Sequence, residues 1–216
     1  MLTQLFAEDS RFFRFMMKLW DLIVLNLLWL VTSLFLVTIG ASTTALYAVM
    51  FQAAENEEGY IVRRFFKEFK RNFRQATVIW LILLGVMAVM MADLYIMGRL
   101  NGMVDGTLSG IVVGVVTVVL VCSALTFLYV FPMQARYVNT VPQTIYKSFV
   151  FSIRHFGCTF QMFGVILLPL GITLVIGMVS NMGWSWCAMF YLLAGVSATS
   201  YWMVKGPWKR LRDKIE

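Results

Sequence analysis

The sequence predicts an all-α polytopic membrane protein with about six transmembrane helices, the second one short, and amphipathic interfacial helices on the cytoplasmic side. Its composition is the first observation, because 60% of the 216 residues are hydrophobic and only 13% are charged. Soluble domains are about half apolar and about a quarter charged, so this chain has too little charge to cover a soluble globule. The second observation is a series of long apolar runs, and the third is that the cations gather between particular runs.

The apolar runs predict membrane-spanning helices, because about 20 apolar residues are needed to cross roughly 30 Å of hydrocarbon. Lipid offers no hydrogen-bond partner to an open sheet edge, so helices are the expected form. We expect one integral membrane domain over residues 1–216. Its expected spans are residues 19–39, 40–57, 78–98, 108–131, 162–180 and 184–204.

The run "GASTTALYAVMFQAA" (40–54) decides the topology, because it follows the first span at once and is short for a crossing. Lys and Arg near span ends favour the cytoplasmic side. If 40–57 returns through the membrane, 17 of the 18 Lys and Arg face the cytoplasm, and otherwise the split is 14 to 4. We therefore expect six crossings with both termini in the cytoplasm, with Gly40 and Ala41 making the turn. A helix that enters and leaves from the inside satisfies the same count.

The stretch "GYIVRRFFKEFKRNFRQAT" (59–77) predicts an amphipathic helix over about 60–75. At about 100° per residue, its hydrophobic side chains fall on one arc and its cations on the opposite arc. This pattern is typical of a helix that lies in the membrane interface, where anionic headgroups attract cations, and it also suits docking of a partner protein. The candidate residues are Arg63, Arg64, Phe65, Phe66, Lys67, Phe69, Lys70, Arg71, Phe73 and Arg74.

We expect this helix to lie flat on lipid before the chain turns into the next span at Val78. A similar amphipathic helix is expected over about 143–156, again directly before a span. Its expected apolar stripe is Ile145, Phe149, Ile153 and Phe156. Nucleic acid is not expected as a partner, because the aromatic face would lie in lipid and no element that reads a groove accompanies it.

Two polar residues inside the spans are candidates for buried contacts. Asn26 is expected to make a hydrogen bond between helices. Asp93 could pair with Arg99, line a solute path or contact a partner. Small residues at helical spacing predict close packing of spans inside the bundle, with oligomerisation as the alternative. These packing residues are Gly110, Gly114, Ala194 and Ala198.

The residue types that catalysis or metal binding requires are not grouped in the sequence. Cys122, Cys158 and Cys187 are scattered and no CxxC occurs, so neither a metal site nor a disulfide framework is predicted. His155 is the sole histidine and is expected at headgroup level. We therefore expect no enzyme activity, no catalytic residue, no metal site and no cofactor.

The segment "IGASTTALYAVMFQAAENEEGYIVRRFFKEFKRNFRQAT" (39–77) resembles the signature of the YesL-like family of bacterial membrane proteins. The pieces that carry the resemblance are Gly40-Ala41-Ser42-Thr43, Ala45-Leu46-Tyr47, Glu58-Gly59-Tyr60, Phe69-Lys70 and Asn72-Phe73-Arg74-Gln75. Members are commonly encoded beside ATP-driven importers of oligosaccharides in Gram-positive bacteria. The resemblance therefore implies a role in sugar import, and it supplies no catalytic residues.

These observations favour a non-catalytic accessory subunit or partner of an ATP-driven oligosaccharide importer. Its expected partners are the anionic bilayer and permease subunits of that importer, in the bacterial plasma membrane. The alternative is a small solute transporter or channel that acts by itself, which would need several polar residues facing one another at mid-depth. A membrane-embedded enzyme is a third class, for which the residues are missing.

Overall fold

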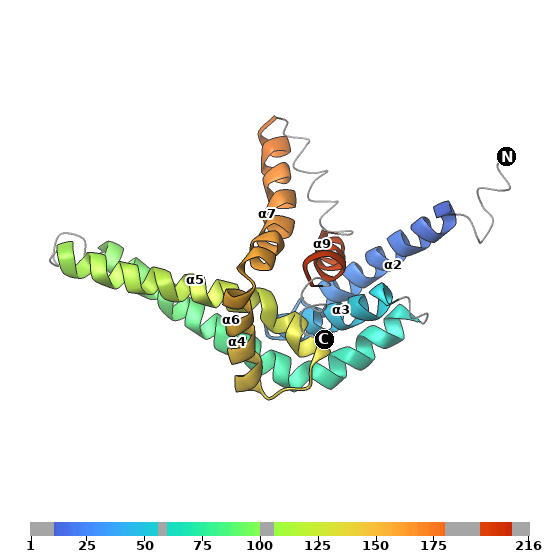
Figure 1. The fold of residues 1–216 in the computed structure, drawn as a ribbon, viewed down its shortest axis with the longest axis horizontal. Helices are drawn as coiled ribbons and strands as arrows, with labels where there is room; N and C mark the ends of the chain where they lie inside the picture. Colours follow the sequence, from blue (N-terminus) through green and yellow to red (C-terminus); the bar gives the residue numbers. More distant parts are fainter. Residues whose placement is uncertain (1–10, 56–59, 100–105, 180–194, 209–216) are drawn as a thin grey trace.

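The computed structural model describes residues 11–55, 60–99, 106–179 and 195–208, and every element in them is a helix (Figure 1). Four of these helices are long and apolar enough to cross a membrane, over residues 36–54, 61–99, 109–136 and 156–175. The elements are α2 (Arg11–Thr32), η1 (Leu36–Thr38), α3 (Ile39–Ala54), α4 (Ile61–Arg99), α5 (Gly106–Arg136), α6 (Val141–Arg154), α7 (Phe156–Val179), α9 (Val196–Met203) and η3 (Val204–Trp208).

The helices α2 and α3 form an antiparallel hairpin whose turn contains the single 3-10 turn η1. The indole N–H of Trp29 on α2 donates to the hydroxyl of Thr43 on α3 at 3.1 Å and ties the two helices together. The expected span 19–39 was wrong at its end, because α2 stops at Thr32. The return of the chain after this segment agrees with the sequence expectation, but the turn lies earlier than expected.

Gly40 lies inside α3 and not in the turn, which corrects the sequence expectation. A Cβ atom on Gly40 would be 2.6 Å from the carbonyl oxygen of Ala76 and 2.6 Å from Cβ of Trp80, both on α4. Glycine therefore allows the backbones of α3 and α4 to approach more closely than any side chain would permit. This crossing fixes the position of the hairpin along α4.

The helix α3 lies at the centre of the bundle. It packs against α2, α4, α5 and α9, and most of its residues are buried. A helix that is apolar all round is expected in a core. Trp208 of η3 closes the same core, with its ring 5.5 Å from the ring of Phe51 on α3 and 6.2 Å from that of Tyr129 on α5.

The amphipathic segment and the span that follows it form one uninterrupted helix, α4, of 39 residues. At 1.5 Å per residue this helix is about 58 Å long, which is about twice the hydrocarbon thickness of a bilayer. The break expected between residue 75 and Val78 was wrong, since helical backbone runs through both. The amphipathic N-terminal half of α4 therefore continues along the same helix axis as the apolar half.

The helix α6 crosses α4 and α5, and α7 leaves the bundle at a steep angle to that pair (Figure 1). Thr140 and Gln143 form a capping box at the start of α6, which fixes its first turn. The buried face of α6 consists of small hydroxyl residues four positions apart, namely Thr144, Ser148 and Ser152. Ile153 and Phe156 of the expected apolar stripe are exposed and lie away from this buried face.

Candidate membrane-interface and docking site

The N-terminal half of α4, residues 61–80, presents three faces along one helix. The side chains buried against the protein are Phe65, Glu68, Asn72, Ala76, Thr77 and Ile79, and we call them the buried face. The exposed cations are Arg63, Lys67, Lys70, Arg71 and Arg74, and we call them the cationic face. Between the two faces runs an exposed apolar stripe of Val62, Phe66 and Phe73. Spacings of three and four residues keep each set on one side of the helix.

The aromatic residues of the segment therefore divide between two environments. The ring of Phe65 is fully buried, and it packs with Phe69 at a centroid distance of 6.3 Å. Phe66 and Phe73 remain exposed, and the ring of Phe73 lies 5.4 Å from that of Phe69. The prediction that all these rings face lipid was wrong for Phe65, because α4 packs this position against the protein core.

Glu68 is the most unexpected member of the buried face, since only 3% of its surface is exposed. Its carboxylate forms an ion pair with Arg71 of the cationic face. The side-chain amide of Asn72 donates to the backbone carbonyl of Glu68 at 3.1 Å. The buried acid thus connects the cationic face to the interior, which restrains the orientation of Arg71.

A second polar contact joins α4 to α5 and α6. The amide nitrogen of Gln134 on α5 donates to the side-chain oxygen of Gln75 on α4 at 2.7 Å. The hydroxyl of Thr144 on α6 lies 3.1 Å from the side-chain oxygen of Gln134. Sequence reasoning missed Glu68, Gln134 and Thr144, and the signal that could have found them is polar residues within otherwise apolar helix faces.

Two cations outside the cationic face lie in the last turns of long helices, Arg136 of α5 and Arg99 of α4. Arg136 at the end of α5 forms an ion pair with Glu55, which follows α3, at 2.9 Å. Its guanidinium also lies over the ring of Phe51, 5.4 Å from the centroid. The last turn of α4 carries Arg99, which lies at the opposite end of that long helix.

The intramembrane candidates lie at different places. Asn26 is buried, and its side-chain oxygen accepts a hydrogen bond from the backbone N–H of Ser197 on α9 at 3.2 Å. The guanidinium of Arg99 donates to the hydroxyl of Tyr95 at 3.0 Å. Asp93 has no ion-pair partner among the described residues, so pairing with Arg99, one of the three roles considered for it, is not observed.

Two of the four predicted small-residue packing positions do not pack as expected. Gly110 and Gly114 are exposed on α5, and a Cβ atom on either glycine would meet no atom within 4 Å. Their predicted role in packing inside the bundle was therefore wrong for this chain by itself. Ala198 on α9 is half-buried, and Ala194 lies outside the described residues.

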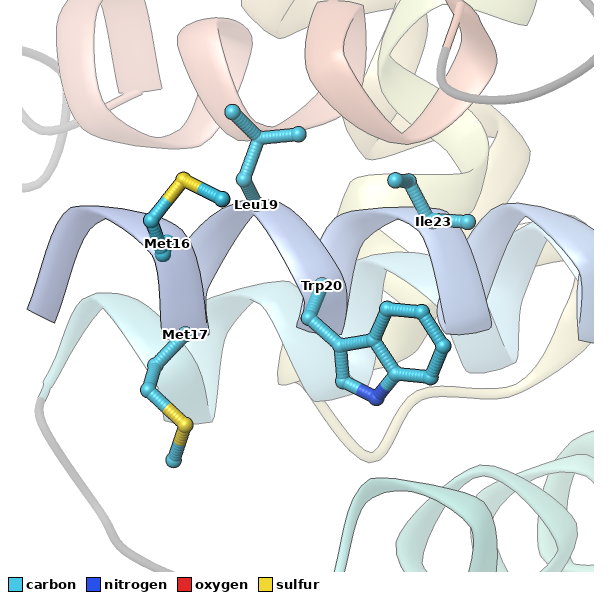
Figure 2. Close-up of a pocket in the computed structure, with 5 residues that line it drawn as sticks. All are labelled: Met16, Met17, Leu19, Trp20 and Ile23. Carbon is cyan, nitrogen blue, oxygen red and sulfur yellow. The ribbon is translucent and has the colours of Figure 1, made fainter. Parts of the chain in front are cut away.

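A shallow apolar pocket lies on the N-terminal half of α2. It is lined by Met16, Met17, Leu19, Trp20 and Ile23, and Figure 2 shows Met17 and Trp20 on the side of the helix opposite Leu19. The lining belongs to a single helix and carries no ionisable side chain. No group of three or more His, Cys, Asp or Glu that could hold a metal occurs within the described ranges.

The comparisons with known proteins point to the same part of the chain. A family described as "Protein of unknown function, DUF624" matches residues 22–94. No curated protein and no solved structure matches the chain. The matched segment contains the α2–α3 hairpin from Leu22 onward and α4 as far as Leu94, so it includes the buried face, the cationic face and the crossing at Gly40.

Proposed function

We propose that the protein is a non-catalytic, multi-pass protein of the bacterial plasma membrane that serves as an accessory subunit of an ATP-driven oligosaccharide importer. In this proposal both termini lie in the cytoplasm, and the cationic face of α4 binds anionic headgroups and permease subunits. The observation that carries it is an exposed row of cations on a helix whose opposite face is packed into the bundle.

The fixed position of the cationic face favours docking of a partner protein over attraction to lipid alone. The cationic face extends from Arg63 to Arg74, about 17 Å along the helix. The close crossing at Gly40 and the hydrogen bonds of Gln134 hold this segment of α4 against α3, α5 and α6. A surface that is already ordered loses little conformational entropy when a partner binds. Attraction to anionic lipid requires only positive charge and does not depend on a fixed arrangement of the cations.

The choice of a sugar importer as partner rests on the resemblance to the YesL-like family, whose members are commonly encoded beside ATP-driven importers of oligosaccharides. The resemblance lies on residues 39–77, inside the segment that matches the family of unknown function. Cytoplasmic termini follow from the positive-inside rule, because 17 of the 18 Lys and Arg then face one side.

The test is co-purification in mild detergent from the protein's own cells. We expect the unaltered protein to recover importer permease subunits, and a Lys67→Glu/Lys70→Glu/Arg74→Glu variant to lose most of them at equal expression. The matched control reverses three cations elsewhere, Lys147, Arg154 and Lys205, and should retain the partners. Loss of the partners from both variants alike would indicate a general effect of charge.

The proposal fails if the unaltered protein is monodisperse and never recovers an importer subunit. Reconstitution in liposomes addresses the alternative of a transporter or channel. Solute flux through vesicles that contain only this protein would replace the accessory role with that alternative.

A further inference from the structure

The turn of the α2–α3 hairpin lies beside the middle of α4. The indole N–H of Trp80 donates to the backbone carbonyl of Leu36 in the turn at 2.8 Å. Two residues after the turn, Gly40 lies against the backbone of Ala76 and Cβ of Trp80. The hairpin therefore runs alongside residues 61–80 of α4, and its tip is level with Trp80.

The α4–α5 pair extends far beyond that level. From Trp80 to Arg99 the helix α4 rises by about 29 Å. The ring of Phe127 on α5 lies 5.9 Å from that of Trp80, and α5 covers about 32 Å between Gly106 and Phe127. Each distance is close to the roughly 30 Å thickness of bilayer hydrocarbon. If this pair crosses the membrane, the hairpin tip lies near the cytoplasmic boundary of the hydrocarbon.

The chemistry of the tip suits hydrocarbon and not water. Leu34, Phe35 and Leu36 are 74%, 73% and 64% exposed, and Val37 beside them is also exposed. No charged residue occurs between Asp21 and Glu55. A loop on the outer surface that exposed four consecutive large hydrophobic residues to water would be unfavourable, at about 25 cal/mol for each Å² of apolar surface.

Several backbone groups of the turn have hydrogen-bond partners within the protein. The hydroxyl of Thr38 donates to the carbonyl of Thr32, and the N–H of Thr38 donates to the carbonyl of Phe35 at 2.9 Å. The carbonyl of Leu36 accepts from Trp80. Non-helical backbone is tolerated at membrane depth only where its polar groups find such partners.

We propose that the α2–α3 hairpin is a re-entrant hairpin that enters the membrane from the cytoplasmic side and does not cross it. Residues 34–37 contact the hydrocarbon of the inner leaflet, continuous with the exposed apolar side chains of Val78, Leu81 and Ile82 that flank Trp80 on α4. This arrangement keeps the cations of α2 and α4 on the same side. In this arrangement neither 19–39 nor 40–57 crosses the membrane. Because two crossings are removed together, the number of Lys and Arg on the cytoplasmic side stays at 17 of 18.

Single cysteines report the depth of the tip. In a full-length background with Cys122, Cys158 and Cys187 replaced by alanine, we would compare Phe35→Cys with two markers. Gly98→Cys marks the far end of α4, where a Cβ atom meets nothing within 4 Å, and Lys70→Cys marks the cationic face. A membrane-impermeant maleimide added to intact cells should label Gly98→Cys only. In inverted vesicles it should label Lys70→Cys strongly, and Phe35→Cys at less than about a tenth of that level.

A fluorescence measurement keeps the test decisive if the labelling of Phe35→Cys is weak for another reason. An environment-sensitive fluorophore on this cysteine, in the reconstituted protein, should be quenched by doxyl-labelled lipid and hardly by aqueous iodide. Labelling of Phe35→Cys from outside intact cells at the level of Gly98→Cys would overturn the proposal. Stronger quenching by iodide than by lipid would also overturn it, as would a failure of Gly98→Cys to react from outside.

Discussion

The N-terminal half of α4 (61–80) and its C-terminal half (81–99) belong to one helix but lie in different surroundings. The first half has a buried face against α3, α5 and α6 and a cationic face on the other side. The second half is apolar and exposed almost all round, and Leu83 is its only buried residue within the described part of the chain. The difference shows that one continuous helix can combine a half that packs against the protein with a half that has the composition of a membrane span.

The same contrast separates α3 from α4 as a whole. In the apolar window of residues 36–54, 56% of the positions are buried inside the chain, against 17% for the window in α4. Both segments have the composition of a membrane span, so composition alone does not tell a buried helix from one that faces lipid. Substitutions in α3, α4 and their neighbours can test which helix surfaces face protein and which face lipid.

The largest effect is expected from a charge in the C-terminal half of α4. Val89→Arg places a guanidinium at an exposed position near the middle of that half. It should disfavour membrane insertion of the helix by about 3 kcal/mol, because lipid cannot solvate it. Val62→Arg, at an exposed position in the N-terminal half, is the matched control and should have little effect. The inserted fraction in a membrane-insertion assay measures both, and equal tolerance of the two would contradict the division of α4.

The next effect concerns the crossing of α3 and α4. Gly40→Val should destabilise the folded protein by about 2 kcal/mol, because a Cβ atom would lie 2.6 Å from the backbone oxygen of Ala76. Gly85→Val is the control, since a Cβ atom on Gly85 meets nothing within 4 Å. Unfolding followed in detergent with increasing denaturant compares the two variants. A loss of stability as large for Gly85 as for Gly40 would show that helix propensity, and not packing, dominates.

A similar but smaller effect is expected where α6 packs through small residues. Ser148→Leu should cost about 1–2 kcal/mol by overpacking a fully buried position. Ser148→Ala should be neutral or slightly stabilising, because the buried hydroxyl of Ser148 has no hydrogen-bond partner in the described residues. Thermal unfolding in the same detergent distinguishes the pair, and a large loss for the alanine variant would mean that the hydroxyl has a partner.

The smallest effect is expected at Asn26. Asn26→Leu removes the hydrogen bond to the backbone of Ser197 and should cost about 1 kcal/mol, as is typical of hydrogen bonds between membrane helices. Leu27→Ala, at the exposed neighbouring position, serves as the control for a change on α2 itself. If the two variants unfold at the same denaturant concentration, the contact between α2 and α9 contributes nothing to stability.

The sequence by itself determined the helical class, the approximate positions of most helices, the return of the chain after the first helix and the grouping of cations. These follow from composition, apolar run length and helical periodicity, which are local properties of the chain. The sequence also identified the cationic face of α4, because cations at a spacing of three and four residues share one side of a helix.

Only the tertiary structure decided which apolar face meets protein and which stays exposed. Phe65 and Phe66 are identical in chemistry, yet α4 buries the first and exposes the second because only the first faces the core. The tertiary structure also placed Glu68 inside the bundle, turned the small hydroxyl face of α6 inward and set the hairpin tip level with Trp80. Hydrophobicity does not distinguish a protein neighbour from a lipid one, so these choices depend on shape complementarity between helices that are distant in sequence.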